Sequence, residues 1–176
     1  EALRRLADKP ALLQPRLPGR HVHAPNVHQC AELGDWLARL HLATVDAPLE
    51  RPSDRGLDWM LEQGPSVALS LPEEQLPLLR GALAELHTLA ARLRALPRAN
   101  LHADLFRDNA LFEGSHLTGV IDFYNACSGP MLYDLAICAN DWCSDAEGQL
   151  DPARSEALLG AYSARRRFHP AEAELW

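Results

Sequence analysis

The chain has 176 residues, enough for one globular domain with a buried core. Its composition, 47% hydrophobic and 23% charged, excludes disordered, collagen-like and disulfide-scaffold proteins. The formal net charge is −7, and the one basic cluster, Arg165 to Arg167, is too short for a nucleic-acid-binding face.

Neither a membrane span nor a disulfide framework is indicated. The most apolar stretch, Met131 to Ala139, is interrupted by Asp134 and is shorter than the roughly 20 residues that cross a bilayer. No signal-peptide pattern opens the chain, and its four cysteines form no Cys-x-x-Cys pair. We therefore expect reduced, buried thiols in a cytoplasmic protein that binds neither membrane nor nucleic acid. The oligomeric state stays open.

The first part of the chain predicts an extended start and then a long helix. A short apolar run with prolines, Lys9 to Gly19, suits an edge strand that leads into an extended connector. Asn26 and Gln29 form a helix-capping pattern, and apolar residues then recur at helical spacing. We predict a helix from about Val27 to Val45.

The middle of the chain predicts two further helical segments. A loop rich in proline and arginine precedes a short segment near Leu57 to Gln63. From Pro72 to Leu96, leucines alternate spacings of three and four, which is the strongest helical pattern present. The stripe also suits a dimerising coiled coil, but it covers only about three heptads. We therefore expect this helix to pack on the core of its own domain.

The pattern changes after Pro97. Two short apolar runs, Asn109 to Phe112 and Leu117 to Phe123, flank a glycine-containing turn and predict a β-hairpin. Helical patterns return from about Met131 to Trp142 and from Pro152 to Phe168. The expected fold class is α+β, a mostly helical domain with one small central β-hairpin.

Polar residues gather at the ends of that hairpin. Asp104 and Asn109 precede its first strand, and Asp122 ends its second. A hairpin brings its two ends together, so these side chains can converge. Carboxylate and amide oxygens suit magnesium. This is the arrangement that phosphoryl transfer needs, with one aspartate for the proton of the attacking hydroxyl and an Asn–Asp pair for the metal.

Three segments resemble the aminoglycoside phosphotransferase and choline kinase superfamily, which has a protein-kinase-like fold. They are Leu-His-Ala-Asp-Leu-Phe-Arg-Asp-Asn at 101–109, Gly-Val-Ile-Asp-Phe-Tyr at 119–124 and Leu-Tyr-Asp-Leu-Ala at 132–136. Within that group the chain looks most like the homoserine kinase branch of threonine biosynthesis, which has alanine between the His and the Asp. The resemblance is specific over residues 97–143 and looser elsewhere. It implies transfer of phosphate from ATP, with Mg²⁺, to the hydroxyl of L-homoserine, giving O-phosphohomoserine.

Carried over residue by residue, the resemblance makes Asp104 the catalytic base and Asn109 and Asp122 the Mg²⁺ ligands. It makes His102 a brace for the catalytic loop and Asp134 a support for that loop from the following helix. Because Asp134 interrupts an apolar pattern, we expect it to have a hydrogen-bonding partner on any interpretation.

The resemblance also implies a nucleotide site. Leu111 and Ile121 match positions that line the adenine pocket, and the segment containing Arg16 and Leu17 resembles the hinge whose backbone binds the adenine edge.

Charge and position suggest the contacts of the acceptor. Asp141 could pair with a substrate ammonium, and Arg107 with a substrate carboxylate or a phosphate. Tyr124, Asn125 and Trp142, with Asp141, lie where acceptor pockets form in the superfamily.

The chain also departs from the superfamily pattern. The small N-terminal lobe of these enzymes carries a phosphate-covering loop and a strand lysine, whereas Lys9, the only lysine here, stands directly before Pro10. We expect residues 1–20 to be the end of that lobe and the hinge, and residues 21–176 the helical C-terminal catalytic lobe. The N-terminal lobe is then largely absent, and activity of this piece alone is in doubt.

Other functions stay open at this point. The chain could be a kinase for an aminoglycoside, a choline-like alcohol or a sugar, or a non-catalytic kinase-like fragment. A metal-dependent hydrolase built on His102, Asp104 and Asp122 is a further alternative, but it leaves Asn109 and Asp134 without a role.

Overall fold

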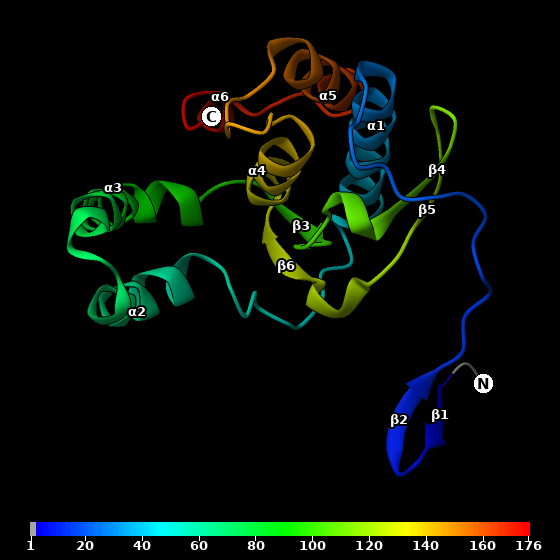
Figure 1. Ribbon diagram of the computed structural model, residues 1–176, viewed down its shortest axis with the longest axis horizontal. Coiled ribbons are helices and arrows are strands. Elements are labelled where there is room, and N and C mark those ends of the chain that lie inside the picture. The colour runs from blue at the N-terminus through cyan, green and yellow to red at the C-terminus, as the bar shows by residue number, and fades with distance from the viewer. Residues whose placement is uncertain (1–2) are drawn as a thin grey trace.

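A computed structural model describes residues 3–176. Three helices share the main hydrophobic core and lie in the upper part of Figure 1: α1 (Val27–Thr44), α4 (Met131–Trp142) and α5 (Pro152–Arg165). Beside them lies an antiparallel hairpin of β4 (Ala110–Glu113) and β5 (His116–Val120). The predicted central hairpin and the predicted helix at Met131 to Trp142 are therefore confirmed.

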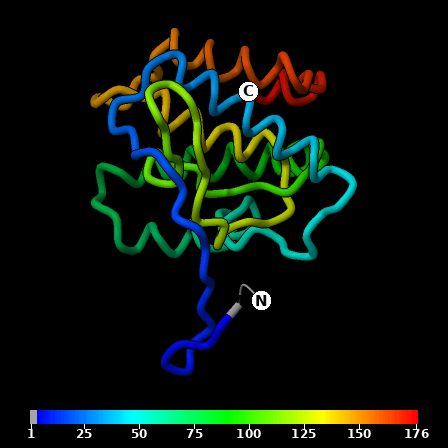
Figure 2. The backbone as a smooth tube through the Cα atoms, turned by 90° about the vertical axis from the view of Figure 1, so that its right-hand side faces the viewer, coloured from blue at the N-terminus to red at the C-terminus, as the bar shows by residue number. Residues whose placement is uncertain are grey.

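The chain begins with a second hairpin, β1 (Leu3–Leu6) and β2 (Lys9–Leu12), which confirms a strand near Lys9. Figure 2 shows this hairpin apart from the rest, joined to it by an extended segment. That segment meets the central hairpin where Arg20 and Phe112 exchange two backbone hydrogen bonds of 2.9 Å. Gly19, at φ +102°, lets the chain turn onto β4 there, in a conformation that other residues seldom adopt.

Helix α1 begins as its capping pattern predicts. The Asn26 side chain accepts a 3.0 Å hydrogen bond from the Gln29 amide, and the Gln29 side chain accepts one from the Asn26 amide. Its apolar face, with Leu33 and Leu37, is fully buried in a cluster that also takes in residues of β4, α4 and α5. Burial of this shared face is the main source of stability for the lobe.

Gly34 sets how closely α1 and α5 approach. A Cβ atom at position 34 would overlap the backbone carbonyl of Leu158 on α5. One at Gly81, within helix α3 (Leu76–Arg94), would meet no atom within 4 Å. We expect Gly34→Ala to lower the free energy of unfolding by about 2 kcal/mol. Gly81→Ala should raise it by up to about 1 kcal/mol through helix propensity. Urea unfolding of both variants checks this, and equal effects of the two substitutions would contradict the close contact.

Helices α2 (Leu57–Val67) and α3 (Leu76–Arg94) form a separate antiparallel pair, seen at one side in Figure 1. Two 3-10 turns, Ala68–Ser70 and Glu73–Gln75, connect them. Helix α2 runs four residues beyond the predicted end and passes through Pro65. The expectation that α3 packs on the main core is wrong. Its leucine stripe is half-buried, packing against α2 and lining an apolar cleft. Ala90 is the one buried residue of this helix in the described part of the chain.

A third strand pair was not predicted. Strand β3 (Arg98–Leu101) pairs antiparallel with β6 (Cys127–Pro130), and Leu101 stands opposite Cys127. The chain ends after a short helix, α6 (Pro170–Ala173), that follows α5. The prediction of a single hairpin was therefore incomplete. The missed pair of β3 and β6 flanks the loop between β3 and β4.

Within residues 3–176, no helix combines the length and the apolar character needed to cross a membrane. All four cysteines are buried free thiols, as predicted.

Candidate active site

The loop between β3 and β4 carries the predicted base, and Asp134 of α4 holds its backbone. The fully buried Asp134 carboxylate accepts hydrogen bonds from the amides of His102 (2.9 Å) and Ala103 (2.8 Å). Ala103 is in the left-handed region, at φ +61°. This strained turn is held by two bonds to one carboxylate, and the expected partner of Asp134 is thus identified.

A buried polar chain extends from Asp134 into α1 and α5. His41 Nε2 lies 3.2 Å from the Asp134 carboxylate, and His41 Nδ1 lies 2.7 Å from the Tyr162 hydroxyl. Burial raises the pKa of Tyr162 above its ordinary value, so the hydroxyl keeps its proton. A carboxylate can only accept, so Nε2 donates to Asp134. In a neutral imidazole Nδ1 then accepts from the Tyr162 hydroxyl. Neither His41 nor Tyr162 was predicted from the sequence to belong to the site.

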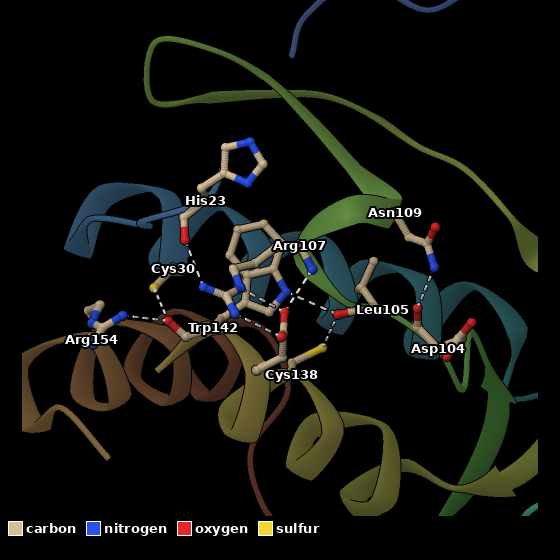
Figure 3. Close-up of polar contacts among 10 residues, drawn as sticks. His23, Cys30, Asp104, Leu105, Arg107, Asn109, Cys138, Trp142 and Arg154 are labelled. Carbon is tan, nitrogen blue, oxygen red and sulfur yellow. Dashed lines mark hydrogen bonds and ion pairs between the residues drawn. The ribbon is translucent and has the colours of Figure 1, made fainter. Parts of the chain in front are cut away.

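Helix α4 also holds the loop at Leu105 (Figure 3). The Leu105 carbonyl accepts a 3.0 Å bond from Trp142 Nε1 and a 3.7 Å contact from the Cys138 thiol. Trp142 is fully buried against Phe112. The prediction that Trp142 contacts the acceptor is corrected here, because its ring packs in the core and its one polar atom is used by the loop.

The backbone of Asp104 is fixed by its own loop. Its carbonyl accepts bonds of 2.8 Å from the Phe106 amide and from Asn109 Nδ2. Because the nitrogen of the Asn109 amide is engaged there, its oxygen points away from that bond, as Figure 3 shows. The predicted base and the predicted amide ligand therefore lie side by side.

Asp122 reaches the same end of the hairpin. The Ile121 amide donates to the Asn109 carbonyl at 3.0 Å, which extends the β4–β5 pairing to the residue before Asp122. Asp122 is exposed and in the left-handed region, at φ +64°. Within residues 3–176 no hydrogen bond or ion pair engages its carboxylate. Asp122 and the Asn109 oxygen are thus unused oxygen donors of the kind that magnesium prefers.

The described residues hold no cluster of three or more His, Cys, Asp or Glu side chains that could bind a metal.

His102 ties the loop to the second strand of the hairpin. Its Nε2 donates to the Ile121 carbonyl at 2.9 Å, and its ring lies 4.6 Å from that of Phe123. Its Nδ1 is buried with no partner among the described residues. This geometry suits the predicted bracing role, because His102 spans from the base to the segment of Asp122.

Arg107 and Asp141, predicted to contact substrate, bind each other. The Asp141 carboxylate accepts from the Arg107 amide at 2.7 Å and from its guanidinium at 3.2 and 3.3 Å. Another guanidinium nitrogen donates to the His23 carbonyl at 2.7 Å (Figure 3). The two charges offset each other and fasten the loop to α4, so this structure does not support a separate role for each in binding substrate.

Two of the predicted nucleotide residues, Leu17 and Leu111, both adjoin Gly119 of the hairpin. Leu17 packs directly over Gly119, and Gly119 pairs with Leu111. Thr118 Oγ1 donates to the Pro18 carbonyl at 2.7 Å and so holds the connector there. A side chain at position 119 would displace Leu17, so this glycine allows the close approach. Ile121 follows Gly119 by two residues in the sequence. The Arg16 side chain is exposed.

Two residues of the segment after Asp122 differ in their surroundings. Tyr124 is 78% exposed. Asn125 turns inward and donates from Nδ2 to the Asp104 carboxylate at 3.0 Å. The resemblance places Asn125 near the acceptor pocket, and its bond to Asp104 was not predicted.

Comparisons with known proteins identify relatives of this chain. The sequence profile described as the phosphotransferase enzyme family matches residues 1–170. A homoserine kinase of Pseudomonas aeruginosa (strain UCBPP-PA14) is 67% identical over 176 residues, which is all of this chain and 56% of that protein. The chain thus spans little more than half the length of this curated relative.

Solved structures share the fold at low sequence identity. An aminoglycoside-3'-phosphotransferase of type VIII has a TM-score of 0.61 and 22% identity, covering 90% of this chain and 63% of the other. An amicoumacin kinase in complex with AMP-PNP, Ca²⁺ and Ami has a TM-score of 0.64 and 18% identity, covering 94% and 53%. The chain therefore has the helical part of a protein-kinase-like fold.

Proposed function

Because this chain belongs to the phosphotransferase enzyme family, we propose that it is the catalytic lobe of a homoserine kinase, which transfers phosphate from ATP to the hydroxyl of L-homoserine. The 67% identity to a homoserine kinase over the whole chain carries the choice of acceptor. The arrangement of Asp104, Asn109 and Asp122 at one end of the hairpin supports the type of reaction.

Asp104 is the base in this proposal. One oxygen of its carboxylate has no hydrogen bond from residues 3–176, so it can accept the proton of the acceptor hydroxyl. The hydroxyl oxygen forms a bond to the γ-phosphorus as the bond between that phosphorus and the leaving ADP oxygen breaks. The proton passes through Asp104 to solvent.

Asn109 and Asp122 would hold the magnesium. Their free oxygens fit a hard cation, and the bond from Asn109 Nδ2 to the Asp104 carbonyl fixes the amide with its oxygen outward. Magnesium, when bound, neutralises charge on the phosphates. The face formed by Leu17, Leu111 and Gly119 offers an apolar surface for adenine.

Residues 1–20 would be the end of a small N-terminal lobe together with the hinge. The site would lie in the cytoplasm, where ATP is available and where the four free thiols stay reduced.

The acceptor is tested in a hybrid enzyme, in which residues 1–176 replace the matching segment of the Pseudomonas aeruginosa relative. We expect release of ADP from magnesium-ATP to depend on L-homoserine. The kcat should lie within about tenfold of the relative's kcat, which corresponds to a difference of about 1.4 kcal/mol in barrier height. An aminoglycoside, choline and a simple sugar serve as competing acceptors.

Release stimulated by one of those acceptors and not by L-homoserine would replace the proposed substrate but keep the kinase. Release without any acceptor would favour a hydrolase. No release from a folded hybrid would indicate a non-catalytic lobe.

A further inference from the structure

The main chain of Asp104 is held firmly, but its side chain depends on a single contact. Two hydrogen bonds reach the Asp104 carbonyl, and Asp134 holds the preceding residue, Ala103. None of these bonds fixes rotation about the Cα–Cβ and Cβ–Cγ bonds of Asp104. Within residues 3–176 the carboxylate itself receives one hydrogen bond, 3.0 Å long, from Asn125 Nδ2.

Asn125 is placed beside Asp104 by the pairing of β3 with β6. Leu101 stands opposite Cys127, so the residues just beyond these strands face each other across the open end of the pair. Asn125 ends a 3-10 turn, Phe123–Asn125, closed by a 3.0 Å bond from the Ala126 amide to the Phe123 carbonyl. The half-buried amide therefore projects from a fixed segment.

The loop before α2 holds this segment from the other side. One Arg51 guanidinium nitrogen donates to the Tyr124 carbonyl at 2.7 Å, and the Arg51 carbonyl accepts from the Ser128 amide at 2.8 Å. Two bonds from one residue thus bracket Asn125. A side chain held in this way can fix the orientation of a neighbouring side chain to which it donates a hydrogen bond.

The chemistry of the pair fixes which amide atom faces the base. An ionised carboxylate only accepts, so the NH₂ group of Asn125 must point to Asp104 Oδ2. The other carboxylate oxygen, Oδ1, has no hydrogen bond from residues 3–176 and can accept one from a substrate. A neutral donor orients the carboxylate without the full positive charge by which an arginine or lysine would weaken a base.

We propose that Asn125 is a positioning residue: it holds the Asp104 carboxylate in the rotamer that directs Oδ1 at the acceptor hydroxyl. The inference rests on the proposed function, in which Asp104 is the base. Proton transfer requires the base within hydrogen-bond reach of the hydroxyl, so a freely rotating carboxylate would spend only part of its time in the reactive geometry.

The first test is a steady-state comparison in the hybrid enzyme. We expect Asn125→Ala to lower kcat by about 10- to 100-fold, the range associated with a small displacement of a catalytic group. The KM values for ATP and L-homoserine should stay within about threefold, because Asn125 acts on the chemical step. Asn140→Ala, which removes an exposed asparagine on α4, should leave both parameters unchanged. The thermal midpoint should be the same in all three proteins.

Two further substitutions distinguish the effect of the hydrogen bond from the effect of side-chain size. Asn125→Gln keeps the donor on a longer side chain and should recover part of the lost kcat. Asn125→Asp keeps the shape but replaces the donor with a like charge, and should be at least as slow as the alanine variant. Equal rates for the three variants, a kcat retained in Asn125→Ala, or a loss that appears in KM alone would overturn the proposal.

A second readout needs no activity. In the 176-residue chain labelled with ¹³C at aspartate carboxyl carbons, the Asp104 signal is assigned by its loss in Asp104→Asn. We expect Asn125→Ala to shift this signal and Asn140→Ala to leave it in place. An unchanged Asp104 signal in Asn125→Ala would overturn the proposal. If the hybrid enzyme does not use L-homoserine, the proposed function fails, and this spectrum still decides whether Asn125 orients the carboxylate.

Discussion

Asp104→Asn in the hybrid enzyme should lower kcat for homoserine-dependent ADP release by about 10³-fold, within the 10²–10⁴ that a general base contributes. The substitution keeps the shape of the side chain but leaves a group that cannot take the hydroxyl proton. The main chain at this position is held by bonds that do not involve the carboxylate, so the loop should keep its conformation. The KM for ATP should change little.

Asp108→Asn is the matched control for this result. Asp108 lies four residues along the same loop, is exposed and carries the same charge. We expect its kcat to stay within about threefold of the unsubstituted hybrid. A similar fall in both variants would mean that the loop's negative charge, and not a base at position 104, supports the reaction.

Asp134→Asn should affect both folding and rate. One carboxylate oxygen becomes an NH₂ group that must face either the Ala103 amide or the donors from His102 and His41. Two buried donors then oppose each other, at a cost of about 3 kcal/mol in the free energy of unfolding. We also expect kcat to fall by about 100-fold, because the strained turn before Asp104 loses its anchor. Urea unfolding and steady-state rates measure the two effects.

Leu158→Ala distinguishes loss of the anchor from loss of stability. Leu158 is fully buried between α5 and α1 and makes no bond to the catalytic loop. This variant should lose about 2–5 kcal/mol of stability as a cavity forms, yet keep its kcat while folded. If kcat fell equally in Leu158→Ala and Asp134→Asn, the anchoring role of Asp134 would be contradicted.

Local signals predicted most of the elements correctly. The Asn26–Gln29 capping pattern gave the start of α1, and the apolar spacing of Met131 to Trp142 gave α4 at its observed bounds. The glycine turn gave the central hairpin, with Asp122 and Asn109 at one end of it. Each of these features depends on residues close together in the chain.

The features that were missed depend on contacts across the chain. Strands β3 and β6 have four residues each, so the alternation of buried and less buried residues in each is too short to stand out in the sequence. Their paired residues are also at least 26 positions apart, so no local pattern marks the pairing. That same pairing places Asn125 beside Asp104. The bond between His41 and Asp134 joins helices 93 positions apart, and neither residue's spacing predicts it.

The predicted acceptor contacts show how charge alone can mislead. Arg107 and Asp141 lie 34 residues apart and were given separate substrate roles, but the packing of α4 against the loop brings them together as an ion pair. For Trp142 the signal was present in the sequence, because it lies seven residues after Leu135 on the buried face of α4.

The most direct test of the proposed function is identification of the product. The hybrid enzyme is incubated with magnesium-ATP and L-homoserine, and the mixture is analysed by ³¹P NMR and mass spectrometry beside the Asp104→Asn variant. We expect a phosphate monoester on the homoserine hydroxyl, formed in step with ADP and absent in the variant. Formation of inorganic phosphate and ADP with unmodified homoserine, or an equal yield of the ester in the variant, would contradict it.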